Sequence, residues 1–278
     1  MTLTRVFSRN KSQVVPWAVL VVLMAFAIIP LISMFVTALF PQNAPPIGLQ
    51  WPTDPQWKNF VTAFVSADYL PLLWSSVLIE LGVVPISVIF ATLAGYGLSL
   101  HKIPGERYIV GVFLLGLTLP VEALITPLYY QMTSLGLLGT RWALILPLIA
   151  LYMPFGVFWM RMNFLGNPKE LSEAAEIDGA SQWQVFWRVQ LPLAVPAWSS
   201  LVILFFLWTW NQFILTVVLV KNPLMGTMAG ALSAFQGQYS TNIVLLCAGC
   251  FLILLPTLVV FIVFQRQFVK ALLQGSSR

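Results

Sequence analysis

Carboxylate side chains are concentrated in one short stretch of the sequence. The chain of 278 residues has only nine Asp and Glu residues, and four of them fall within nine positions: Glu170, Glu173, Glu176 and Asp178. Like charges this close on one helix destabilise it slightly unless a basic partner lies nearby. The stretch is therefore either a solvated amphipathic helix on a membrane surface or a surface that meets another protein.

Two further acids lie inside apolar sequence. Glu80 and Glu122 are flanked by long hydrophobic runs, and an acid that faces lipid costs about 2.5 to 3.5 kcal/mol on insertion scales. We therefore expect both to face the interior of a helix bundle, where they either contact a polar solute, form a gate hydrogen bond or tie two helices together. Trp210, Asn211 and Gln212 form a third candidate group, because adjacent Asn and Gln side chains suit the recognition of hydroxyls better than lipid.

Known catalytic and nucleotide-binding patterns are missing from the sequence. The chain has no Gly-Lys dipeptide, so it cannot form a G-x-x-x-x-G-K-[ST] phosphate loop. It has a single histidine, no H-E-x-x-H motif and no cluster of metal ligands. We expect a chain that is not an enzyme and binds no metal or cofactor.

The composition is typical of a membrane protein. Hydrophobic residues make up 59% of the chain and charged residues 8%, against about 25% charged residues in soluble domains. A helix needs about 20 mostly apolar residues to cross a bilayer. Six runs come close to or exceed this length: residues 14–38, 72–100, 108–132, 142–162, 193–220 and 243–264. The sequence predicts an all-α polytopic membrane protein with six transmembrane helices in one domain, residues 1–278.

The basic residues are distributed unevenly around these runs. If the N-terminus is cytoplasmic, only Lys58, Arg141 and Lys221 of the fourteen Lys and Arg residues fall outside. This is the positive-inside bias of an inner-membrane protein. It places both termini and the loop 163–192 in the cytoplasm of a bacterial cell, and it explains the net charge of +5 without a nucleic-acid partner.

The loop 163–192 is predicted to contain two short helices. Asn167 is expected to cap the first, with Pro168 at its first position, and Gly179 to end it. Ser181, followed three residues later by Gln184, forms a capping-box pattern for the second helix. Leu191-Pro192 is expected to stop that helix at the membrane surface.

The spacing within this loop resembles the signature loop of binding-protein-dependent ABC importer permeases. It reads Glu173-Ala174-Ala175, three residues, Gly179, nine residues, Val189, one residue and Leu191-Pro192. Val189 stands where the family pattern most often has isoleucine. The resemblance implies the fold of a type I ABC importer permease. It also implies that the segment from Glu173 to Gly179, including Asp178, is a coupling helix that docks on an ATPase dimer, where ATP and Mg would bind.

Four other segments are similar to the carbohydrate branch of this family, the MalG-like permeases. They are Leu93 to Gly97, Pro127 to Tyr129 with Leu135 to Leu137, Trp210 to Phe213, and Gln265 to Val269; the stretch Gly237-Gln238-Tyr239 also fits. Gln212 departs from the pattern, which often has glutamate there, and so does Asn242-Ile243, where an acid and tryptophan are common.

This second resemblance implies a sugar or sugar-like solute that an extracytoplasmic binding protein delivers to this chain and a second permease. Two alternatives stay open. One is an ion-coupled carrier that uses Glu80 and Glu122 for protons, and the other is an ABC permease for a solute such as a glycerol phosphodiester.

Overall fold

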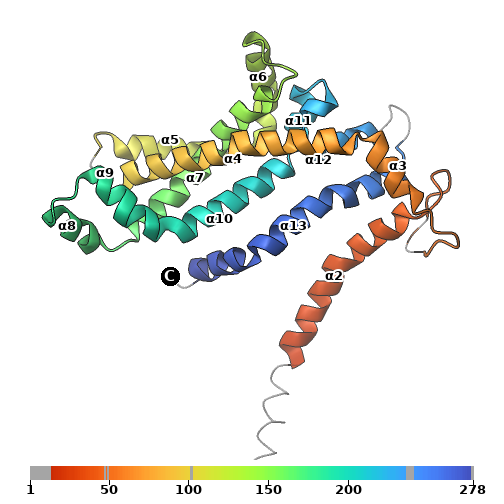
Figure 1. The fold of residues 1–278 in the computed structure, drawn as a ribbon, viewed down its shortest axis with the longest axis horizontal. Helices are drawn as coiled ribbons and strands as arrows, with labels where there is room; N and C mark the ends of the chain where they lie inside the picture. Colours follow the sequence, from red (N-terminus) through yellow and green to blue (C-terminus); the bar gives the residue numbers. More distant parts are fainter. Residues whose placement is uncertain (1–13, 47, 49, 101–102, 236–240, 277–278) are drawn as a thin grey trace, which may run out of the picture. The chain divides into compact units, whose positions relative to one another are not determined.

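The computed structural model describes residues 14–46, 48, 50–100, 103–235 and 241–276, and every regular element in these ranges is helical (Figure 1). Contacts divide the chain into two compact units. The first comprises residues 1–66 with 234–252, and the second comprises residues 67–233 with 253–278. The last helix, α13 (Ile243–Ser276), contributes residues to both units.

Five helical segments are long and apolar enough to span a membrane in the described part of the chain. They are Pro16–Ala38, Tyr69–Leu100, Trp142–Leu165, Gln182–Trp210 and Ile243–Gln265. The corresponding helices are α2 (Val14–Ala38), α4 (Tyr69–Leu100), α7 (Trp142–Leu165), α10 (Leu191–Trp210) with the short segments before it, and α13. Two bent helices count as a sixth span if they are taken together.

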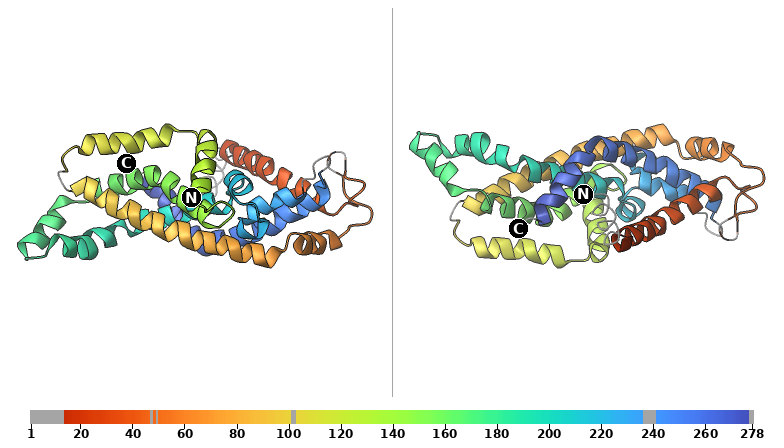
Figure 2. Two further views of the ribbon diagram at one scale, coloured as in Figure 1. Left: turned by 90° about the horizontal axis from the view of Figure 1, so that it is seen from above. Right: turned by 90° about the horizontal axis from the view of Figure 1, so that it is seen from below.

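The predicted span 108–132 is not one straight helix. It consists of α5 (Glu106–Thr118) and α6 (Val121–Ser134), which are bent by 101° relative to each other. Figure 2 shows these two helices running in different directions. The break lies at Leu119 and Pro120, whose ψ angles of 123° and 128° are extended. Proline disfavours helical backbone in the residue before it, so Pro120 explains why the helix stops there.

The predicted span 193–220 is also interrupted. Helix α10 ends at Trp210, and α11 (Ile214–Leu219) follows after a short turn. The backbone carbonyl of Gln212 in this turn accepts hydrogen bonds from the hydroxyls of Thr216 at 3.0 Å and Thr227 at 2.6 Å. Because these side chains satisfy the carbonyl, the turn is stable without a continuing helix.

The core of the second unit is built mainly by α4, α7 and α10. Small residues allow these helices to approach closely. A Cβ atom on Gly95 of α4 would lie 2.7 Å from the Cβ of Met160 on α7, and one on Gly156 would lie 2.7 Å from the Cβ of Ala91. Gly95 belongs to the segment Leu93 to Gly97, so close packing explains this glycine.

The segment after α11 folds back against α4. It contains η2 (Pro223–Met225), α12 (Met228–Ala231) and η3 (Leu232–Phe235). The backbone N–H of Met228 donates to Ser76 Oγ at 2.7 Å, and Arg141 Nε donates to Ser75 Oγ at 3.0 Å. Gly237-Gln238-Tyr239 lies outside the described residues.

In the first unit, one asparagine holds the chain that follows α2. The side chain of Asn59, on α3 (Lys58–Ser66), is buried and donates to the carbonyls of Ala38 at 2.9 Å and Phe40 at 2.8 Å. Gln42 Nε2 donates to Asn59 Oδ1 at 3.2 Å. This amide therefore satisfies carbonyls that the end of α2 leaves without helical partners.

Candidate functional site

The predicted acidic helix is present as α8 (Lys169–Ile177), which lies beyond the start of α10 at the left of Figure 1. None of its residues is buried, and the Ile177 side chain is 86% exposed. Glu173 and Ala174 are exposed and Ala175 is half-buried. The acids of α8 have no basic partner among the described residues. The ion pair in this part of the chain joins Arg161 to Glu106 instead. The helix therefore presents an acidic and partly apolar surface that the rest of the described chain leaves uncovered.

Gly179 ends α8 in a specific geometry. Its φ angle is 83°, which is the left-handed region that glycine adopts readily. The N–H of Ala180 donates to the carbonyl of Ala175 at 2.9 Å, and the N–H of Gly179 donates to that of Glu176 at 3.0 Å. These two bonds form a Schellman motif, so the predicted helix end at Gly179 is confirmed together with its physical cause. Asp178 precedes this turn and is exposed.

The second short helix, α9 (Gln182–Val185), begins with the predicted capping box. The Ser181 hydroxyl accepts from the N–H of Gln184 at 3.3 Å, and the Gln184 side chain accepts from the N–H of Ser181 at 2.8 Å. A π-helical turn, η1 (Phe186–Gln190), joins α9 to α10. Leu191-Pro192 does not stop this segment, because both residues lie within the first turn of α10. The helical backbone continues through Gln182–Trp210, and the irregular hydrogen bonding of the π-helical turn just before Pro192 accommodates a residue that lacks an N–H.

The prediction that Asn167 caps α8 is wrong. The N-cap position is occupied by Pro168, and no side chain caps the helix there. The amide of Asn167 instead donates to Gln190 Oε1 at 2.8 Å. A long-range partner competes for this side chain, and local spacing gives no signal of it.

Aromatic packing attaches the loop to the helices of the second unit. The ring of Tyr96 on α4 lies 4.7 Å from that of Phe186 and 5.4 Å from that of Phe164 on α7, measured between centroids. Phe186 and Phe164 are almost completely buried. The end of α4 therefore contacts the turn that leads into α10.

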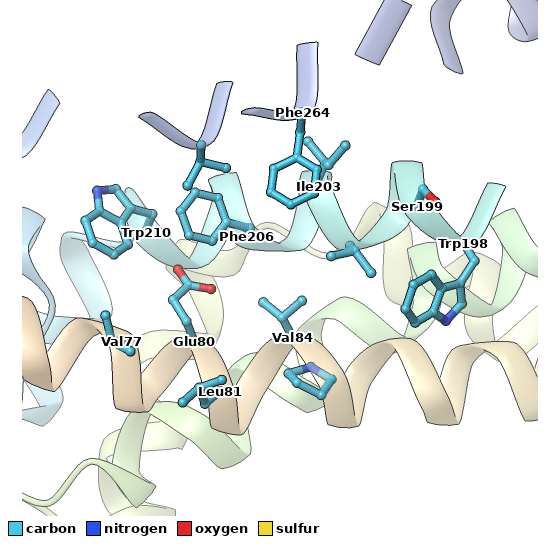
Figure 3. A pocket seen from close by; sticks show the side chains of 13 residues that line it. Val77, Glu80, Leu81, Val84, Trp198, Ser199, Ile203, Phe206, Trp210 and Phe264 are labelled. Atoms are coloured by element: carbon cyan, nitrogen blue, oxygen red, sulfur yellow. The ribbon is translucent and has the colours of Figure 1, made fainter. Parts of the chain in front are cut away.

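Glu80 and Trp210 are brought together, as Figure 3 shows. Both line a cavity of ≈ 410 Å³ between α4, α10 and the part of α13 that belongs to the second unit. Glu80 is 8% exposed, and neither carboxylate oxygen has a hydrogen-bond partner among the described residues. Trp210 stacks on Phe206 and directs its Nε1 to the carbonyl of Ile253 at 3.4 Å. The expectation that Glu80 faces the bundle interior agrees with this position.

Asn211 and Gln212 lie in the turn after α10 and do not line the Glu80 cavity. The Asn211 amide donates to the carbonyl of Leu207 at 2.8 Å, and its side chain is exposed. Gln212 is half-buried, and its side-chain oxygen accepts weakly from the N–H of Leu215 at 3.4 Å. Part of each polar side chain is thus engaged with the backbone of a neighbouring helix, α10 for Asn211 and α11 for Gln212.

Glu122 does not face the interior of this chain. It is exposed in the first turn of α6, directly after the break at Pro120. The break removes Glu122 from the middle of a straight span, and the positive end of the α6 dipole favours a carboxylate in this turn. The structure therefore separates Glu122 from Glu80.

Within the described residues, no group of three or more His, Cys, Asp and Glu side chains is arranged to hold a metal ion.

These features define a class of protein: a helical polytopic membrane protein whose surface carries a short acidic helix after a span. Residues 84–274 match the family model for the inner membrane component of binding-protein-dependent transport systems. The chain belongs to this family, and the predicted family is confirmed. It is a multi-pass component of the inner membrane.

The chain is similar over nearly its full length to permease proteins of transport systems. It is 32% identical to the arabinooligosaccharides transport system permease protein AraQ of Halalkalibacterium halodurans, with 96% of this chain and 98% of the relative covered. It is 30% identical to the trehalose transport system permease protein SugB of Mycobacterium tuberculosis, with 94% of this chain and 96% of the relative covered. The ion-coupled carrier is not favoured, because these relatives are transport-system permeases.

A solved structure confirms the fold. The chain superposes with a TM-score of 0.75 on a chain of a bacterial ABC transporter involved in the import of the acidic polysaccharide alginate, at 20% identity. The match covers 93% of this chain and 97% of that chain. The predicted permease fold is therefore shown by structural similarity as well as by sequence.

Proposed function

We propose that this chain is the permease subunit of an ATP-driven importer for a sugar or sugar-like solute. The observation that carries the proposal is full-length similarity to permeases named for arabinooligosaccharide, trehalose and diacetylchitobiose uptake. A second permease would complete the pathway, and a binding protein outside the membrane would deliver the solute. A partner ATPase dimer would bind ATP and Mg and supply the energy.

Helix α8 is the proposed docking element for this ATPase. Glu173, Ala174 and Ala175 form its middle, and Asp178 and Gly179 form its end. Its acids lack basic partners in the described chain, and its exposed Ile177 offers an apolar contact beside them. A capped helix transmits a displacement better than a flexible loop, which suits the conversion of ATPase closure into movement of α10.

Charge reversal tests the docking role. We expect Glu173→Lys to leave the permease folded but to reduce the amount of ATPase bound to it, because an exposed side chain contributes little to folding. Tagged permease is purified from its native membranes in mild detergent, and co-purifying Mg-dependent ATP hydrolysis is measured. Glu170→Lys is the matched control, because it makes the same charge change on α8 outside the proposed docking residues. Normal ATP hydrolysis with Glu173→Lys, or equal losses with both variants, would contradict a specific role for Glu173.

The cavity at Glu80 and Trp210 is the proposed contact with the solute inside the membrane. A carboxylate with two free acceptor oxygens can accept hydrogen bonds from adjacent sugar hydroxyls, and indole and phenyl faces pack against the apolar face of a sugar ring. The other lining side chains are almost all apolar, so this subunit would contact one edge of a ring. Asn211, Gln212 and Glu122 are the further candidates along the pathway, at the turn after α10 and at the start of α6.

The outer segment 221–242 is the proposed contact with the binding protein. Its residues between η2 and η3 are held to the turn before α11 by the bond from the Thr227 hydroxyl to the carbonyl of Gln212 at 2.6 Å. Gly226 and Gly230 pack against Thr216, where an added Cβ would lie 2.5 and 2.2 Å from its Cγ2. A partner that presses on this segment would therefore act directly on the turn that carries Asn211 and Gln212.

A further inference from the structure

Gln190 is the most buried polar side chain near α8. It is the last residue of η1, directly before α10, and it is 1% exposed. Its Nε2 donates to Ser172 Oγ at 2.7 Å, and its Oε1 accepts from Asn167 Nδ2 at 2.8 Å. One amide thus joins the chain before α8, the helix α8 itself and the start of α10.

These bonds matter because α8 has little else to hold it. The helix has no buried residue, so apolar packing does not fix it to the second unit. Its other side-chain bond to the following segment, from Gln182 Nε2 to Glu176 Oε1 at 2.6 Å, is exposed to solvent. Water competes with an exposed hydrogen bond, whereas a buried amide that loses its partners remains unsatisfied.

The position of Gln190 also fits the transmission of movement. Helix α10 begins at Leu191, and its later turns carry Phe206 and Trp210, which line the Glu80 cavity. On the other side, Ser172 lies next to Glu173 in α8. Gln190 therefore connects the proposed docking helix directly to the residue before α10.

We propose that Gln190 is a positioning residue that makes α8 and the start of α10 move as one rigid body. The role of this connection in transmitting movement from the ATPase rests on the proposed function, whereas the rigid connection between α8 and α10 is a property of the permease alone. Without the amide, α8 would be free to change its angle to α10, because Gly166 and Gly179 flank it on either side.

Distances between spin labels test the rigid connection. Labels are placed at Lys169 on α8 and Val195 on α10, which are both exposed, after Cys247 and Cys250 have been replaced by alanine. We expect one narrow distance distribution in the otherwise unchanged permease, and a broad or second population with Gln190→Met, which keeps the side-chain length but not the bonds. Ser172→Ala, a milder change, is expected to broaden the distribution in the same direction.

Two conservative variants distinguish positioning from general damage. Ser172→Thr keeps the hydroxyl, and Gln182→Met makes the same chemical change as Gln190→Met at the exposed bond; both should keep the narrow distribution. A narrow distribution with both Gln190→Met and Ser172→Ala would overturn the proposal, and so would equal broadening with Gln182→Met. If Gln190→Met does not fold, the comparison of Ser172→Ala with Ser172→Thr decides the role of Gln190: a broad distribution with alanine and a narrow one with threonine supports the proposal, and equal distributions overturn it.

The same labels separate this inference from the proposed function. Where the ATPase co-purifies, addition of MgATP with vanadate should leave the distance between Lys169 and Val195 unchanged in the original complex and alter it with Gln190→Met. A change in the original complex would contradict rigid movement. If no ATPase co-purifies, the proposed function fails, while the measurement on the isolated permease still decides the role of Gln190.

Discussion

At the scale of single residues, Glu80 is the side chain whose environment is most unusual. An acid that is 8% exposed and lacks hydrogen-bond partners in the described chain lowers the stability of the fold. Natural proteins retain such residues mainly where function requires them. The cavity beside it gives room for a ligand that would supply the missing donors.

This reasoning predicts opposite effects on stability and transport for Glu80→Leu. Replacing an unsatisfied buried polar group by an apolar one should raise the free energy of unfolding by about 1 to 3 kcal/mol. Loss of hydrogen bonds to the solute should raise the KM for uptake about tenfold or more. Thermal unfolding in detergent gives the first quantity, and cellular uptake of a labelled sugar that the unchanged transporter carries gives the second.

Ser199→Ala is the control for this experiment. Ser199 lines the same cavity, but its hydroxyl already donates to the carbonyl of Val195 at 2.7 Å. We expect no change in KM. A loss of stability with Glu80→Leu, together with a normal KM, would show instead that Glu80 ties helices together.

The candidate residues can be predicted from sequence only where a local pattern determines them. Ser181 and Gln184 form the expected capping box because both bonds run between residues three positions apart. Gln190 gives no such signal, because its partners lie 18 and 23 positions away. Glu122 does not lie in the interior of this chain, because the helix break at Pro120 puts it in the exposed first turn of α6, and the apolar pattern does not show where such a break separates two helices.

At the scale of helices, the end of α8 depends on one backbone conformation. Gly179 has no other atom within 4 Å of an added Cβ, so only its φ of 83° opposes a side chain. A left-handed residue costs an L-amino acid about 1 to 2 kcal/mol, and asparagine tolerates it better than most. The cost falls on α8 alone, because this helix buries nothing in the core.

We therefore predict that Gly179→Val reduces ATPase binding while the thermal unfolding of the permease changes little. Gly179→Asn should retain most of the binding. Gly97→Ala is a suitable control, since Gly97 has no close neighbours and its φ is not positive. Co-purified ATP hydrolysis and unfolding temperature are measured for all three variants. Equal binding by the valine and asparagine variants would show that the left-handed turn is not needed for docking.

Helix positions follow from the sequence better than helix continuity does. Five of the expected runs correspond to helices that qualify as spans, because length and apolarity determine them. The interruptions after Thr118 and Trp210 are not evident from the apolar pattern. Proline occurs inside several uninterrupted helices of this chain, including Pro85 in α4 and Pro154 in α7. A proline in the sequence therefore does not show by itself whether the helix that contains it continues or ends.

At the scale of the whole molecule, the charge distribution predicts an orientation in the membrane. The positive-inside bias assigns eleven of the fourteen basic residues to the cytoplasmic side together with α8. Two exposed positions test this assignment: Ile177 on α8 and Lys221 in the outer segment. In a chain without native cysteines, Lys221→Cys should react with a membrane-impermeant maleimide in spheroplasts, and Ile177→Cys should react only after permeabilisation.

Permeabilised spheroplasts provide the control for this labelling, because both cysteines should then react. Reaction of Ile177→Cys in intact spheroplasts would place α8 outside. That result would reverse the orientation and remove α8 from the reach of any cytoplasmic ATPase.

The absence of buried residues in α8 also affects how such a protein can change over evolutionary time. Substitutions in residues 169–177 do not disturb the core, so this segment is free to diverge as long as Gly179 and the bonds of Gln190 are kept. Exchange of the exposed residues of this helix other than Ser172 would therefore change the proposed docking surface and leave the core intact.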